Sequence, residues 1–72
     1  MKLQMRLEDA MVFVLASAGY GMTTQRIADA INNQQLHIRC DGKPVTSAQV
    51  YAAVCRNSHT FVKEGGRILL SI

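Results

Sequence analysis

The sequence predicts a small α+β fold of the winged helix-turn-helix class, with three helices followed by a C-terminal β-hairpin wing. Two observations carry this prediction. Residues 46–57 have the pattern of a helix that leads directly into two short strands around Gly65-Gly66. Two shorter amphipathic segments precede that helix. The 72 residues suffice for one small domain, residues 1–72, with a single aliphatic core.

The first two helices are predicted by the spacing of their apolar residues. One spans about residues 6–18 and the other about residues 24–34. Gly19-Tyr20-Gly21 separates them, because glycine tolerates the left-handed conformation in which helices end. Thr23 is the expected N-cap of the second helix. The inner faces are aliphatic: Leu7, Met11, Val14, Leu15 and Ala18 in the first helix, and Ile27, Ala30 and Ile31 in the second.

The connection that follows, residues 36–45, is longer than the roughly 3–4 residues of a simple helix-turn-helix. Leu36 and Ile38 have the alternation of a short strand with both side chains directed inward. Asp41-Gly42-Lys43-Pro44 is expected to form a turn, because proline cannot continue a helix and Asp and Gly adopt unusual backbone angles.

The third helix has the strongest start signal in the chain. Thr46-Ser47-Ala48-Gln49 matches the capping box, with Thr46 as cap and Gln49 reaching back to its backbone. The predicted inner stripe is Val50, Tyr51 and Val54. The opposite face then carries Ala48, Gln49, Ala52, Cys55 and Arg56.

The predicted hairpin pairs about residues 60–63 with residues 68–71 across the two-residue loop Gly65-Gly66. Phe61 is expected to point into the core. Ile68, Leu69 and Leu70 are all apolar, so this strand breaks the alternation of a half-exposed strand. Either the chain covers both faces of the strand, or one face requires a partner outside the chain.

The formal net charge is +3, and all of the excess lies in the second half. Acidic and basic residues balance within residues 1–34. A positive surface suits the phosphate backbone of a nucleic acid, although +3 alone is more typical of an ordinary, modestly basic protein surface. The charges of residues 35–72 are Arg39, Lys43, Arg56, Lys63 and Arg67 against Asp41 and Glu64.

The order and spacing of these segments resemble the HARE-HTH domain, a winged-helix family. The matching pieces are an apolar helix (residues 10–15), a helix that starts with Thr after a short break (21–28), a Gly-Lys-Pro turn with a third helix (42–50), and a glycine-containing wing opened by a Phe (61–69). The resemblance extends from about Leu7 to Leu70. The chain departs from the family pattern at Gly42-Lys43-Pro44, which lacks the usual residue between Lys and Pro.

The resemblance implies a DNA-binding module that acts in transcription or beside chromatin regulators and DNA-modifying or restriction enzymes. A related domain forms the folded part of a bacterial RNA polymerase subunit, where the contact is with protein. The sequence therefore leaves two hypotheses. One is binding to double-stranded DNA, and the other is a protein-interaction module that docks on a larger enzyme such as RNA polymerase, or on its own copy.

In the DNA hypothesis, residues 46–57 form the recognition helix and residues 60–71 the wing. Arg56 is expected to contact phosphate or guanine, and Gln49 adenine. Helix N-termini bind phosphate, which assigns Thr46 and Ser47 to that role. Thr46 and Gln49 have the alternative role of capping the helix only, and Arg56 that of an ordinary solvated side chain. The remaining predicted contacts are Lys43, Lys63 and Arg67.

Other functions are disfavoured. His37-x-x-Cys40 and Cys55-x-x-x-His59 supply zinc-type ligands, but their spacing is loose, so we expect no metal and no cofactor. No paired carboxylates, phosphate loop or oriented nucleophile appears, so we expect no enzyme and no small-molecule substrate. No apolar run approaches the roughly 20 residues of a membrane span, which favours the cytoplasm, or the nucleoid in a bacterium.

Overall fold

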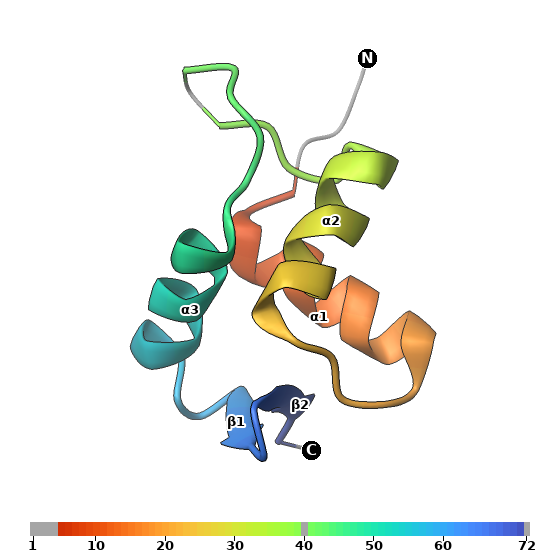
Figure 1. Ribbon diagram of the computed structural model, residues 1–72, viewed down its shortest axis with the longest axis vertical. Helices are drawn as coiled ribbons and strands as arrows, with labels where there is room; N and C mark the ends of the chain where they lie inside the picture. The colour runs from red at the N-terminus through yellow and green to blue at the C-terminus, as the bar shows by residue number, and fades with distance from the viewer. Residues whose placement is uncertain (1–4, 40, 72) are drawn as a thin grey trace.

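A computed structural model describes residues 5–39 and 41–71. Within them the chain forms three helices and then a two-stranded antiparallel hairpin, the layout of a winged helix (Figure 1). The α+β prediction is thus confirmed, and the helix and strand bounds agree with the expected ones to within about one residue. The elements are α1 (Leu7–Ala18), α2 (Thr24–Gln34), α3 (Ser47–Arg56), β1 (Phe61–Glu64) and β2 (Arg67–Leu70).

The ends of α1 and α2 follow from local backbone chemistry. Gly19 has a φ of 76°, and its N–H donates to the carbonyl of Leu15, which ends α1. Thr23 caps α2, because its side-chain oxygen accepts from the N–H of Arg26 at 3.2 Å. At the other end of α2, Gln35 adopts a left-handed conformation with φ 53°.

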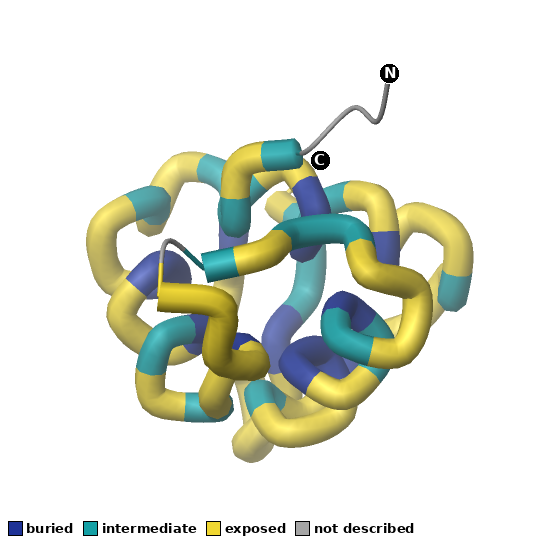
Figure 2. The backbone as a smooth tube through the Cα atoms, turned by 90° about the horizontal axis from the view of Figure 1, so that it is seen from above, coloured by how far each residue is buried: buried dark blue, intermediate teal, exposed yellow. Residues whose placement is uncertain are grey.

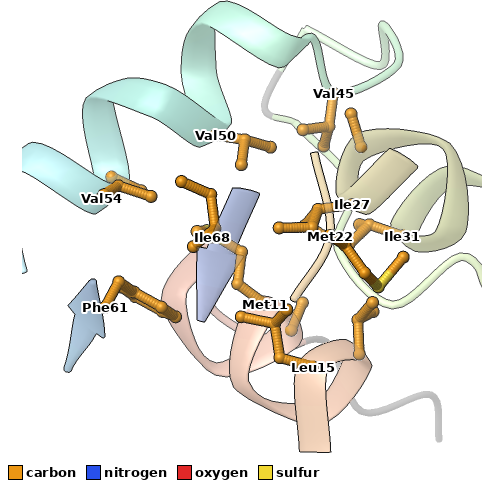
Figure 3. Packing of buried hydrophobic residues seen from close by; sticks show 14 residues of the cluster. Met11, Leu15, Met22, Ile27, Ile31, Val45, Val50, Val54, Phe61 and Ile68 are labelled. Carbon is orange, nitrogen blue, oxygen red and sulfur yellow. The ribbon is translucent and has the colours of Figure 1, made fainter. Parts of the chain in front are cut away.

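The core is aliphatic, as predicted, apart from Phe61, which is buried in it as expected, and residues from all three helices and the hairpin meet there (Figure 3). Ile68 of β2 is 1 % exposed and lies among side chains of the helices. Two predictions about the core need correction. Three alanines that were left out of the inner stripes are buried, because small side chains let helices approach closely. These residues are Ala10, Ala28 and Ala53.

Tyr51 was assigned to the inner stripe of α3, and that assignment is wrong: its exposed fraction is 45 %. The buried stripe of α3 is Val50, Ala53 and Val54. Successive helical residues are rotated by about 100° around the helix axis. Tyr51 is therefore turned about 100° away from Val50, whereas Ala53 lies about 60° from Val50 in the other direction and stays within the buried stripe. The phenol ring therefore lies at the surface, at the edge of the core.

The hairpin is extended by a third strand position that the sequence did not reveal. Met22, between α1 and α2, pairs antiparallel with Ile68 through two backbone hydrogen bonds of 3.1 and 2.7 Å. Strand β2 is therefore central, with β1 on one side and Met22 on the other. On the face away from the core, Gly21 leaves space that Leu69 occupies: a Cβ at Gly21 would lie 3.0 Å from the Leu69 Cγ.

This arrangement explains why β2 contains three consecutive apolar residues. Ile68 is buried, Leu70 packs against the core, and Leu69 lies over Gly21. Leu69 and Leu70 are both half-buried. The chain itself accordingly covers much of both faces of the strand, and no outside partner is needed to explain its composition.

The connection between α2 and α3 differs from the prediction in one respect. Residues 36–39 form no strand. The N–H of Leu36 completes the end of α2 by donating to Ile31, and its carbonyl accepts from Met5 at 3.2 Å, so the segment pairs with the N-terminal chain instead. Ile38 is 43 % exposed.

The turn predicted before α3 is present. The N–H of Lys43 donates to the Asp41 carboxylate at 3.0 Å, and the N–H of Gly42 donates to the carbonyl of Arg39 at 2.9 Å. The Asp41 carboxylate also forms an ion pair with Arg39 at 2.8 Å. These contacts stabilise the turn.

One side chain ties this connection to the helices. The Asn32 Oδ1 accepts from the N–H of Val45 at 2.8 Å, and its Nδ2 donates to the carbonyl of the same residue at 2.9 Å. Asn32 lies in the last turns of α2, and Val45 immediately precedes the cap of α3. The two bonds thus satisfy the backbone of Val45 where its side chain enters the core.

We predict that Asn32→Ala lowers the free energy of unfolding by about 1–3 kcal/mol, because it leaves two partly buried backbone groups of Val45 unsatisfied. Urea denaturation measures the loss. The matched control is Asn33→Ala at the neighbouring exposed position, which should change stability by less than about 0.5 kcal/mol. Equal unfolding midpoints for the two variants would show that the Asn32 contact contributes nothing.

Candidate nucleic-acid interface

The outer side of α3 is open to solvent. Within residues 5–39 and 41–71 no other element covers it, and the hairpin lies at the C-terminal end of the helix (Figure 1). Buried and exposed residues alternate along the helices, with the buried ones turned inward (Figure 2). The face opposite the buried stripe carries the residues predicted there: Ala48, Ala52, Cys55 and Arg56 are exposed and Gln49 is half-buried.

The N-terminus of α3 is closed by the predicted capping box. The Thr46 Oγ1 accepts from the N–H of Gln49 at 3.3 Å, and the Gln49 Oε1 accepts from the N–H of Thr46 at 3.2 Å. Capping is therefore one role of both side chains. The Gln49 amide nitrogen and the Thr46 hydroxyl hydrogen are the groups that a further contact would use. Ser47, the first residue of α3, is half-buried.

Lys63 of β1 lies against α3. Its Nζ is 4.7 Å from the centroid of the Tyr51 ring and 3.3 Å from the Tyr51 hydroxyl oxygen. The contact joins the wing to the flank of α3 nearest to it. Sequence reasoning missed Tyr51, because its apolar ring was counted as core. A signal was present in its hydroxyl, which favours a position at the edge of a core.

Arg67 lies on the other face of the hairpin. Lys63 pairs with Ile68, and Glu64 pairs with Arg67, so Lys63 and Arg67 project from opposite faces of the sheet. The Arg67 guanidinium donates to the carbonyl of Gly21 at 3.2 Å. The structure thus brings one of the two predicted wing cations to α3 and directs the other toward the connection between α1 and α2.

Arg56 and Lys63 border the exposed face of α3 from different flanks. Arg56 is five residues beyond Tyr51, which places it about 140° further around the helix. Lys63 contacts the Tyr51 flank. Arg56 lies in the last turn, where a cation is also favoured by the helix dipole. The two cations therefore bracket the face formed by the two exposed alanines, Ala48 and Ala52.

Lys43 lies in the turn before α3, which is at the opposite end of this helix from the hairpin (Figure 1). Its side chain is exposed. Arg39 in the same turn is engaged by Asp41 at 2.8 Å and by the carbonyl of Pro44 at 3.3 Å. Because Arg39 and Asp41 offset each other, Lys43 supplies the net charge at that end.

The described residues among the possible zinc ligands, His37, Cys55 and His59, do not form a metal-binding group. The His37 Nδ1 is 2.7 Å from the carbonyl oxygen of Met5, and Cys55 is exposed on α3. Cys40 lies outside the described residues. Residues 5–39 and 41–71 contain no group of three or more His, Cys, Asp or Glu side chains arranged to hold a metal. Nor does any helix in these ranges have the length and apolar character to cross a membrane.

A scan against protein-family models, a search of curated proteins and a search of solved structures each return no match to this chain. The resemblance to the HARE-HTH domain therefore stays a prediction. A function for the domain has to be argued from its exposed residues, because the winged-helix layout by itself is compatible with DNA and protein partners alike.

We predict that Thr46→Asp separates the capping role of Thr46 from contact with phosphate. Aspartate caps a helix as well as threonine, so stability should stay within about 0.5 kcal/mol of the original, whereas Thr46→Ala should cost about 1 kcal/mol. The new negative charge at the α3 N-terminus should nevertheless weaken binding to duplex DNA. Thermal unfolding and a DNA-binding titration measure the two effects.

The matched control is Thr23→Asp, which retains the cap of α2 and adds the same charge at the start of a different helix. It should weaken DNA binding less than Thr46→Asp does. Equal losses of affinity would mean that only net charge matters, and that the N-terminus of α3 does not approach phosphate.

Proposed function

We propose that this domain binds double-stranded DNA, with the exposed face of α3 in the major groove and the β1–β2 wing against the phosphate backbone. The observation that supports this most is the open face of α3, bordered by Arg56 on one flank and by the Tyr51–Lys63 pair on the other. A major groove about 12 Å wide admits a helix in this orientation.

The distribution of charge supports the same proposal. Helix α3 contains no acidic residue. Asp41 is offset by Arg39, which leaves Glu64 as the one acid of residues 41–71 without an ion pair. A phosphate backbone near α3 would thus meet an excess of cations and little repulsion. These cations are Lys43, Arg56 and Lys63, since Arg67 lies on the other face of the hairpin.

The side chains on the open face also indicate what kind of binding to expect. Ala48 and Ala52 allow the helix backbone to approach the bases closely, but they form no hydrogen bonds with them. Hydrogen-bond readout then depends on Arg56 and on the amide nitrogen of Gln49. We therefore expect affinity to come mainly from phosphate contacts, with modest sequence preference. Such a partner implies the cytoplasm, or the nucleoid in a bacterium.

A protein partner is the second candidate, and exposed hydrophobic side chains support it. Tyr20 is 59 % exposed and Val62 is 41 % exposed. Val62 shares a sheet face with Leu69, which lies over Gly21 next to Tyr20. Docking of this face on a larger enzyme such as RNA polymerase, or on a second copy, would cover it. The composition of β2 no longer adds support, because the chain accounts for Ile68, Leu69 and Leu70 itself.

We predict that binding to a labelled random-sequence duplex depends strongly on salt. If three or four phosphates are contacted, affinity should fall about 40- to 150-fold between about 50 and about 200 mM salt. Arg56→Ala and Lys63→Ala should each reduce the slope of log K against log salt by about 1. Fluorescence anisotropy at several salt concentrations measures both quantities.

The matched control is Arg6→Ala, which removes the same charge from an exposed position just before α1. It should leave the slope nearly unchanged. Absence of binding at low salt would refute the DNA proposal. In that case, sedimentation of the free protein at micromolar concentration tests self-association as the alternative.

A further inference from the structure

The contact between Tyr51 and Lys63 is formed by two exposed residues, so burial in the core does not account for it. Tyr51 is 45 % exposed, so its ring contributes only partly to the core. Lys63 is exposed on an edge strand, where a lysine normally extends into water. Instead its Nζ lies 4.7 Å from the ring centroid and 3.3 Å from the hydroxyl oxygen. The ring thus holds the ammonium group by a cation–π contact and a hydrogen bond.

We propose that Tyr51 is a positioning residue, which holds the Lys63 ammonium group at the junction of α3 and the wing so that it meets a phosphate of the bound duplex. This inference rests on the DNA-binding function proposed above. Tyr51 itself need not touch the DNA. Its effect on affinity is expected to pass through Lys63.

The surroundings of Lys63 favour this role over a purely structural ion pair. In the described part of the chain, the one salt bridge is between Arg39 and Asp41, so the charge of Lys63 is not neutralised by a carboxylate. Glu64, its neighbour along β1, projects from the other face of the sheet, where Arg67 is its cross-strand partner. The charge of Lys63 is therefore oriented but still available.

The ammonium group retains capacity for a phosphate while it is held. It has three N–H donors, and the Tyr51 hydroxyl oxygen takes one of them. A cation–π contact uses the charge rather than a specific N–H, and so leaves the other donors accessible. Lysine carries a large rotamer entropy, much of which is lost when a phosphate orders it. A ring that restricts these rotamers beforehand reduces this loss on binding.

The test is a double-mutant cycle on duplex binding with Tyr51→Leu, Lys63→Ala and the combination. Tyr51→Leu should weaken binding about two- to fivefold, which corresponds to an exposed cation–π contact. In the Lys63→Ala background it should cause no further loss. Tyr51→Phe preserves the ring face and should lose less than Tyr51→Leu, so it also serves if the leucine variant is poorly folded.

A control and an independent readout accompany the cycle. Tyr20→Leu removes the other, similarly exposed tyrosine and should leave the affinity unchanged. In the free protein, the ring should shift the NMR signals of the Lys63 side-chain protons next to Nζ upfield. Tyr51→Leu should abolish this shift, and Tyr51→Phe should retain most of it.

The outcomes distinguish this inference from the function on which it rests. If the original protein does not bind duplex at low salt, the DNA proposal fails and Tyr51 has no such role. If the protein binds but Tyr51→Leu has the same effect with and without Lys63, only the positioning role is overturned. Unchanged or tighter binding by Tyr51→Leu overturns it as well. The positioning role is supported if Tyr51→Leu weakens duplex binding in the original protein but not in the Lys63→Ala background.

Discussion

The pairing of Met22 with Ile68 is the constraint on which the rest of the structure depends. It joins two segments that are far apart in the sequence, and it makes β2 the central strand of a small sheet. Because Ile68 is paired on both sides, its side chain is held inside the core, among residues of all three helices. The wing is thereby part of the folded body rather than an independent hairpin, which would be marginally stable in water.

The orientation of α3 depends on a second tertiary contact. The Asn32 side chain forms hydrogen bonds with both the N–H and the carbonyl of Val45, and so connects the end of α2 with the residue that precedes the cap of α3. A connection longer than that of a simple helix-turn-helix would otherwise leave the direction of α3 loosely determined. The Asp41 turn and the contact of Leu36 with Met5 order the remainder of this segment.

Together these contacts present a helix face that is small, open and bordered by cations. Its chemistry suits close approach to a regular, negatively charged surface better than recognition of many base edges. The division of the wing cations between two faces matters here. Lys63 is oriented toward α3, whereas Arg67 donates a hydrogen bond to the carbonyl of Gly21 in the α1–α2 connection. Only Lys63 of this pair therefore belongs to the face of α3.

Local chemistry was sufficient to predict the elements. Periodicity located the helices, the Thr46 capping box marked the start of α3, and Gly65-Gly66 located the hairpin turn and its register. Each of these signals acts within a few residues, which is why the sequence by itself determined them. The third strand position at Met22, the exposed ring of Tyr51 and the separation of Lys63 from Arg67 were decided only by the tertiary structure. They depend on contacts between residues that are distant in the sequence, and such contacts exist only after the helices and the hairpin have packed around a common core.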